Sequence, residues 1–183
     1  MSIEPKPGLV VRYDFLWKEE RRAGIEDGKD RPCAIVLTSA AKSNGSKEVL
    51  LCAITHSPPT KNETAVKVPP AVAKHLGLDH EQSWIKTDQV NRLTWERDRM
   101  PYGISQARKG EWTFGMIPQG LGKEVFNQVR EKARSRSLQT VNREEPATGN
   151  ETYQARSLKW AIKERRGPDR NHGPGSSEPE RER

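Results

Sequence analysis

Two apolar runs joined by a polar segment that contains Asn44-Gly45 constrain the fold of this chain most. The runs are residues 32–39 (PCAIVLTS) and 49–57 (VLLCAITHS). Asn-Gly between two apolar runs is a strong signal for a β-hairpin, because both residues accept the backbone angles of its tight turn. Pro32 suits the first residue of a strand, where its missing N–H costs no ladder hydrogen bond. We therefore expect antiparallel neighbours, with Arg31 and Thr55 on the same rim.

The remaining periodicity predicts three more strands and two helices. Strands are expected at residues 8–17, 64–69 and 83–93, and helices at residues 69–81 and 120–134. A turn with a short strand is expected within residues 102–118. In the second helix Leu121, Val125 and Val129 form one apolar stripe. The polar segment 18–30 predicts a long loop. The fold class is therefore mainly β with short helices, a small antiparallel barrel with a C-terminal amphipathic helix.

Composition divides the chain near residue 135. Only 32% of the residues are hydrophobic and 31% are charged, which is too polar for a packed globule throughout. After residue 135 the apolar periodicity ends, and glycine, proline and mixed charge take its place. We expect a barrel domain over residues 1–135 and a disordered basic and polar tail over residues 136–183.

Charge and cysteine usage restrict the compartment and the partners. The formal net charge is +7, which favours a polyanionic partner such as nucleic acid. Cys33 and Cys52 lie inside apolar runs, as expected for two buried thiols in a reducing compartment. No stretch resembles a signal peptide or a membrane span, so we expect a cytoplasmic protein without a membrane partner.

The chemistry available to this chain is that of ordinary side chains. The sequence has no phosphate-binding glycine loop and no nucleophile elbow, and its four histidines lack metal-ligand spacing. We therefore expect no cofactor and no metal. Three polar sets interrupt the apolar stretches: Arg31, then Thr55-His56-Ser57, then Lys86-Thr87-Asp88-Gln89 with Arg92.

The order of these segments resembles the MazF/PemK family of toxins from toxin–antitoxin pairs. The residues that carry the resemblance are PGLVVRYDF, RPCAIVLTS, LLCAITHSP, WIKTDQVNRL and FGMIPQGLGKEVFNQV, between about Pro7 and Arg130. The resemblance implies an SH3-like barrel that forms a homodimer. It also implies metal-independent, sequence-selective cleavage of single-stranded RNA, and a cognate antitoxin that lies across the active groove.

The same resemblance assigns four catalytic residues. Arg31 and Thr55 match the arginine and threonine of the family's catalytic rim, and Lys86 and Asp88 match a basic residue and an aspartate that some members use. A guanidinium offers fixed donors for the charge that develops on phosphate oxygens, so Arg31 is expected to stabilise the transition state. Thr55 would position the phosphate, and Asp88 would act as the base beside Lys86.

Substrate contacts are expected from residues around this rim. The candidates are Arg21, Arg22, His56, Ser57, Gln89 and Arg92. Trp17 and Trp84 each either belong to the core or stack an unpaired base. The segment from Asp14 to Arg31 is longer than in typical members and lacks their Gly-Ser/His-Glu-Gln signature. Two alternatives therefore stay open. One is a non-catalytic SH3-like module that binds nucleic acid or a peptide, and the other is a toxin that acts on a topoisomerase.

Overall fold

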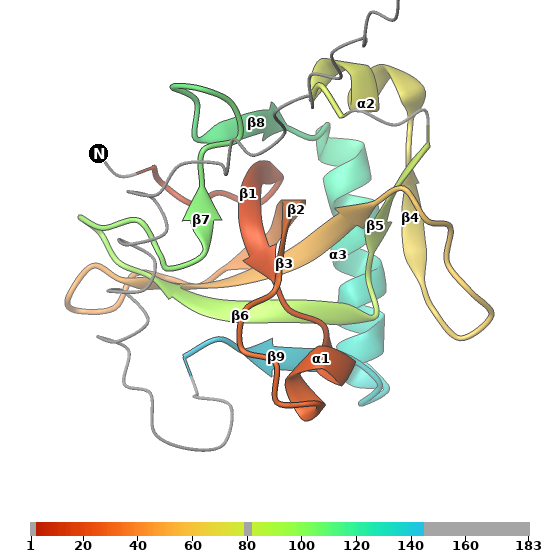
Figure 1. The fold of residues 1–183 in the computed structure, drawn as a ribbon, viewed down its shortest axis with the longest axis horizontal. Helices are drawn as coiled ribbons and strands as arrows, with labels where there is room; N and C mark the ends of the chain where they lie inside the picture. Colours follow the sequence, from red (N-terminus) through yellow and green to blue (C-terminus); the bar gives the residue numbers. More distant parts are fainter. Residues whose placement is uncertain (1–2, 79–81, 145–183) are drawn as a thin grey trace, which may run out of the picture.

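The computed structural model describes residues 3–78 and 82–144, which form nine strands and three helices (Figure 1). The strands are β1 (Leu9–Phe15), β2 (Lys29–Thr38), β3 (Lys47–Thr55), β4 (Ala65–Val68), β5 (Ser83–Lys86), β6 (Gln89–Trp95), β7 (Ile104–Ser105), β8 (Thr113–Met116) and β9 (Gln139–Asn142). The helices are α1 (Lys18–Arg22), α2 (Pro70–His75) and α3 (Gln119–Arg134). The predicted class, mainly β with short helices and a long C-terminal amphipathic helix, is confirmed.

One sheet joins all nine strands. Its main path runs β4-β5-β3-β2-β1-β7, while β6 pairs with β3 and β9, and β8 pairs with β1. Every pair is antiparallel except β6–β9, which is parallel. Within the described ranges the strands do not close into a hydrogen-bonded ring. The predicted antiparallel barrel is therefore an open one with a parallel strand added at β6.

The predicted hairpin is formed by β2 and β3. Their register runs from Cys33 opposite Ala53 to the far end of both strands, with one irregularity after Ile35. At the turn, the Asn44 side chain accepts a hydrogen bond from the Ser46 N–H (3.0 Å), and Gly45 has φ +78°. The same register brings the first residues of β2 to the last residues of β3.

The two faces of the β2–β3 hairpin contribute to two different cores. Ala34 and Cys52 belong to a cluster that α3 covers, whereas Cys33 and Ala53 belong to a second cluster around β1 and β6. Burial on both faces explains why these runs are continuously apolar. Both cysteines are free and fully buried, and this burial raises the pKa of each thiol.

Two predicted elements differ from the structure within the first 95 residues. The predicted loop 18–30 begins with a helix, α1. At its start, Glu20 accepts a hydrogen bond from the Trp17 N–H (3.0 Å), which satisfies one of the N–H groups that a helix leaves free there. The predicted strand 83–93 is two strands, β5 and β6, separated at Thr87. The Thr87 side chain is fully buried and lies 2.8 Å from Gln128 of α3, so the chain turns there towards the helix.

The prediction of disorder from residue 136 onwards is wrong for the residues just after α3. Residues 139–142 form β9, which pairs with β6, and Val141 is buried. The sequence hides this strand because it is short and lies in a polar context. The rest of the predicted tail, residues 145–183, lies outside the described residues. Among the helices that are described, none has the length and apolar character of a membrane span.

Candidate active site

A pocket of about 210 Å³ lies at the rim where β2 begins and β3 ends. Its lining consists of Arg12, Lys29, Asp30, Arg31, Pro32, Ile54, Thr55, His56, Gly77, Leu78, Ser83 and Phe114. Arginine and lysine side chains outnumber the single carboxylate in this lining. The pocket therefore favours an anionic ligand.

Arg31 has an unusual environment for a charged side chain. Its guanidinium lies 5.4 Å from the centre of the Trp17 ring, a cation–π distance. Its Nε atom is buried, and no residue in the described part of the chain accepts a hydrogen bond from it. Buried donors without a partner are rare in folded proteins, and a bound ion or ligand is one of the groups that can supply the partner.

Thr55 is the last residue of β3 and lines the same pocket as Arg31. Its hydroxyl donates a hydrogen bond to the Ser57 carbonyl (3.1 Å). His56 is exposed and also lines the pocket, whereas Ser57 is exposed and contributes that carbonyl from outside the lining. Arg31 and Thr55 therefore lie at one rim, as predicted, and His56 lies beside them.

Lys86 and Asp88 do not line this pocket. Lys86 is buried at the end of β5, and its Nζ atom forms an ion pair with Glu63 (2.7 Å). That contact lowers the pKa of Glu63 to about 2. Because Lys86 follows Trp84 by two residues and Trp84 is paired with Thr55, strand alternation puts Lys86 on the same face of the sheet as Thr55.

Asp88 lies in the turn between β5 and β6. It is partly buried, and burial raises the pKa of its carboxyl. Its Oδ1 atom is buried and receives no hydrogen bond from the residues that the structure describes. A carboxylate with a raised pKa and a vacant acceptor has the properties of a general base.

The other predicted substrate contacts lie away from the pocket lining. Arg21 and Arg22 are in α1, and only Arg22 is exposed. Gln89 accepts a hydrogen bond from the Lys18 N–H (3.0 Å) and therefore anchors the start of α1. Arg92 is exposed in β6, where its guanidinium binds Glu48 (2.8 Å).

The sequence analysis missed two cationic residues of the pocket. Arg12 is paired with Pro32 across the β1–β2 ladder, and Lys29 is the first residue of β2. Arg12 could have been recognised as a candidate, because it is a charged residue inside the mainly apolar run of β1. Lys29 carries no such signal, because it stands in a polar segment that reads as a loop.

A second arginine, Arg143, anchors the β1–β2 connection. Its side chain is buried and binds three groups: it donates to the Tyr13 hydroxyl (3.1 Å), to the Glu26 carbonyl (3.0 Å) and to the Asp14 carboxylate (3.1 Å). Asn91 of β6 adds two hydrogen bonds with the backbone of Leu16. The β1–β2 connection is thus held at Leu16 by β6 and at Glu26 by a residue that follows α3.

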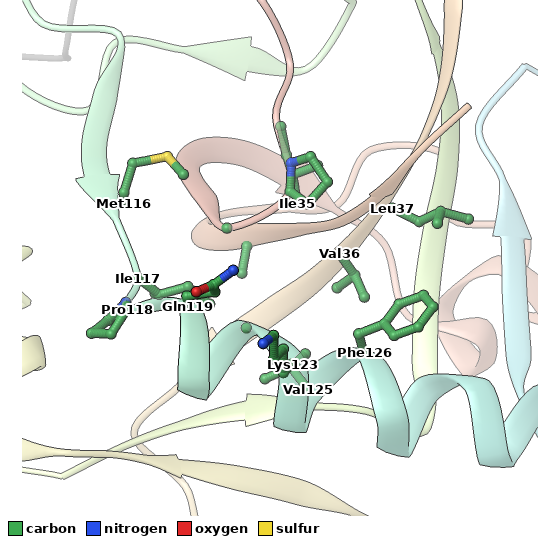
Figure 2. A pocket seen from close by; sticks show the side chains of 14 residues that line it. Ile35, Val36, Leu37, Met116, Ile117, Pro118, Gln119, Lys123, Val125 and Phe126 are labelled. Carbon is green, nitrogen blue, oxygen red and sulfur yellow. The ribbon is translucent and has the colours of Figure 1, made fainter. Parts of the chain in front are cut away.

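A second hollow in the molecule is mainly apolar. This groove of about 430 Å³ lies between β2, the end of β8 and the first half of α3, and Val36 and Phe126 face each other across it (Figure 2). The polar side chains in its lining are Gln119 and Lys123. With Lys123 as the single charged side chain of this lining, the groove lacks the cluster of cations that the first pocket offers to an anionic substrate.

Comparison with known proteins agrees with the geometry. The family model described as PemK-like, MazF-like toxin of type II toxin-antitoxin system matches residues 6–112, more than half of the chain. The match spans Arg31, Thr55, Lys86 and Asp88 and ends before α3 and β9. No curated protein and no solved structure matches the chain. In residues 3–78 and 82–144, no three or more His, Cys, Asp or Glu side chains are grouped to hold a metal ion.

Proposed function

Because the chain belongs to the PemK-like, MazF-like toxins of type II toxin–antitoxin systems, we propose that it is a metal-independent, sequence-selective endoribonuclease that cleaves single-stranded RNA. The observation that carries the proposal is the shared lining of one cationic pocket by Arg31 and Thr55. Arg31 brings a buried donor without a partner among the described residues, and a phosphate oxygen is a suitable acceptor for it.

The proposed reaction uses the RNA itself as nucleophile. The ribose 2′-hydroxyl loses its proton to a base and attacks the adjacent phosphorus, and the bond from phosphorus to the 5′-oxygen breaks. The 5′-oxygen takes up a proton, so the products are a 2′,3′-cyclic phosphate and a 5′-hydroxyl. DNA lacks the 2′-hydroxyl and cannot follow this route.

Arg31 and Thr55 are proposed to act on the phosphate. The guanidinium stabilises the negative charge that grows on the phosphate oxygens during attack, an effect worth about 10²–10³-fold for one well-placed donor. Its persistent positive charge makes Arg31 unsuitable as a proton donor. The Thr55 hydroxyl, which now binds a backbone carbonyl, orients the phosphate by donating to it.

Asp88 is proposed as the base on the family resemblance, although it does not line the pocket with Arg31 and Thr55, and Lys86 acts on it at a distance. The positive charge of Lys86 favours the ionised form of Asp88 and opposes the desolvation that raises its pKa. His56 lines the pocket beside Thr55 and is the second candidate for proton transfer. Cleavage rates of Asp88→Asn and His56→Asn distinguish the two, since the variant that removes the base loses the larger part of the rate.

The test of the function is cleavage of a long single-stranded RNA by the purified chain in excess chelator. We expect cleavage at short recurrent sequences with cyclic phosphate ends, and we expect Arg31→Ala to abolish both cleavage and growth inhibition while the melting temperature is unchanged. A strict requirement for Mg²⁺, or undiminished toxicity of Arg31→Ala, would falsify the proposal. RNA retention without cleavage across many sequences would instead identify a binding module, and intact RNA with poisoned topoisomerase would identify a toxin of that enzyme.

The proposed partners follow from the family. We propose a cognate antitoxin that covers the cationic pocket and a homodimer of the toxin. Light scattering measures the dimer directly. If the antitoxin covers the pocket, RNA cleavage stops when it is added in equimolar amount, and charge reversal at Lys29, Lys29→Glu, weakens that inhibition.

A further inference from the structure

Trp84 differs from the other tryptophans that the structure describes. Trp95 is buried in the second core cluster, and Trp17 and Trp112 pack against that cluster. Trp84 is part of neither described cluster, although it is only partly exposed. Part of its aromatic surface is therefore available outside both cores.

The strand register puts Trp84 between Thr55 and Lys67. Trp84 is paired with Thr55 of β3 on one side and with Lys67 of β4 on the other. Paired residues of antiparallel strands project to the same face, with their Cβ atoms about 4.5–5.5 Å apart. The alternate residues Val66 and Ile85 belong to the first core cluster, so Thr55, Trp84 and Lys67 share the outer face of the sheet.

Trp84 and Lys67 already interact on that face. The Lys67 ammonium lies 5.5 Å from the centre of the Trp84 ring, and Lys67 is exposed. The Trp84 Nε1 atom is buried, and no group within the described ranges accepts its hydrogen bond. The pair therefore combines an aromatic surface, a cation and an unused donor beside the proposed catalytic Thr55.

We propose that Trp84 and Lys67 form a nucleotide subsite next to the cleaved bond. The base of that nucleotide stacks on the indole, and the Lys67 ammonium leaves the ring to bind the phosphate of the same nucleotide. Stacking on aromatic side chains and tracking of the backbone by cations are the two elements of single-strand recognition. The inference rests on the proposed function, because it takes the phosphate bound by Arg31 and Thr55 as its neighbour.

The first experiment measures binding of a random pool of single-stranded RNA, about 12 nucleotides long, by fluorescence anisotropy. We expect Trp84→Leu to weaken binding about 5- to 150-fold, the equivalent of the roughly 1–3 kcal/mol attributed to one stacked base. Trp84→Phe keeps an aromatic surface and should restore most of the affinity. Lys67→Met should reduce the dependence of affinity on salt, whereas Lys123→Met, which removes an exposed lysine from the apolar groove, should not.

The second experiment locates the stacked base. A cleavable oligonucleotide is prepared in versions that each lack one base near the cleaved bond. At one position the missing base should raise KM by the same factor as Trp84→Leu does. Combining that missing base with Trp84→Leu should raise KM no further than either change alone. The subsite proposal would be wrong if the increases in KM were additive at every position. It would also be wrong if Trp84→Leu bound the RNA pool as the wild type does with an unchanged melting temperature.

The two proposals fail in different ways. If the wild-type chain binds the RNA pool through Trp84 but cleaves no RNA, the nuclease proposal is wrong and the subsite stands. If the wild-type chain cleaves RNA and Trp84→Leu cleaves it with the same KM and kcat, the nuclease proposal stands and the subsite is wrong.

Discussion

Arg31 and Arg143 both lie close to the β1–β2 connection and differ in how their donors are used. Arg143 is buried and donates to a hydroxyl, a carbonyl and a carboxylate. Arg31 has a buried Nε without an acceptor among the described residues and faces an open pocket. A satisfied buried cation stabilises one conformation, whereas an unsatisfied one retains its binding capacity for a ligand. The fold thus holds one arginine whose donors are used within the protein and one that keeps a donor for a ligand.

The largest loss of stability is expected when Arg143 and its hydrogen bonds are removed. Arg143→Leu leaves the Asp14 carboxylate, which is 8% exposed, without its buried guanidinium. Removing one member of a buried ion pair costs about 3–5 kcal/mol, so we expect the free energy of unfolding in urea to fall by that amount. Arg130→Leu, which removes an exposed arginine on α3, is the matched control and should change it little. Equal stability of the two variants would contradict the structural role of Arg143.

Replacing Arg31 should reduce activity and leave the stability of the fold almost unchanged. Arg31→Gln removes the guanidinium from the pocket and should slow RNA cleavage by about 10²–10³-fold. The free energy of unfolding should stay within about 0.5 kcal/mol of the wild-type value, because Arg31 makes few contacts that the fold requires. A loss of stability as large as that of Arg143→Leu would mean that the two arginines do not differ as described.

Asn91 extends the satisfied network and should show a smaller loss. Its side chain is 1% exposed and bonds both the N–H and the carbonyl of Leu16. Asn91→Leu leaves those two backbone groups without these partners, and an unsatisfied buried group costs about 1–3 kcal/mol. We expect a loss of roughly 2 kcal/mol in the unfolding free energy. Faster hydrogen exchange confined to residues 16–28 would show that the loss arises in the β1–β2 connection.

The smallest effect concerns pH and the ion pair of Lys86 with Glu63. The pKa of Glu63 is lowered from 4.5 to about 2. A lowered carboxyl pKa stabilises the fold above the ordinary value, and this stability is lost as the pH falls towards the folded value. The melting temperature of Glu63→Gln should therefore be below that of the wild type at pH 6, and the difference should shrink between about pH 5 and pH 2.

Asp88 is the control for Glu63, because its pKa is shifted in the opposite direction. Burial raises its pKa, so its ionised form opposes folding once the pH exceeds that raised value. Asp88→Asn should therefore raise the melting temperature at pH 7 while it slows cleavage. Parallel pH profiles for Glu63→Gln and Asp88→Asn would contradict both assignments.

The sequence predicted most of the fold because its signals are local. The Asn44-Gly45 turn and the two apolar runs define the β2–β3 hairpin, and the spacing of Leu121, Val125 and Val129 defines α3. β9 was missed because one buried residue, Val141, carries no periodicity, and its pairing with β6 is set by tertiary contacts. The break at Thr87 was missed for a similar reason, since its cause lies on α3 at Gln128.

The candidate site was predictable where it depends on the hairpin alone. Arg31 and Thr55 meet because antiparallel register brings the start of one strand to the end of the next. The surroundings of Lys86 were not predictable, because its partner Glu63 comes from a loop with no pattern. The contacts of Arg143 join residues more than a hundred positions apart, a distance over which a single sequence carries no pairing information.

The place of Arg143 in the chain affects the order in which the protein is completed during translation. Arg31, Thr55 and their pocket are synthesised well before Arg143, whose contacts fix the β1–β2 connection. A nascent chain that has left the ribosome only as far as α3 therefore carries Arg31 and Thr55 without the contacts of Arg143. The β1–β2 connection is therefore completed only after β9 and the residue that follows it have emerged.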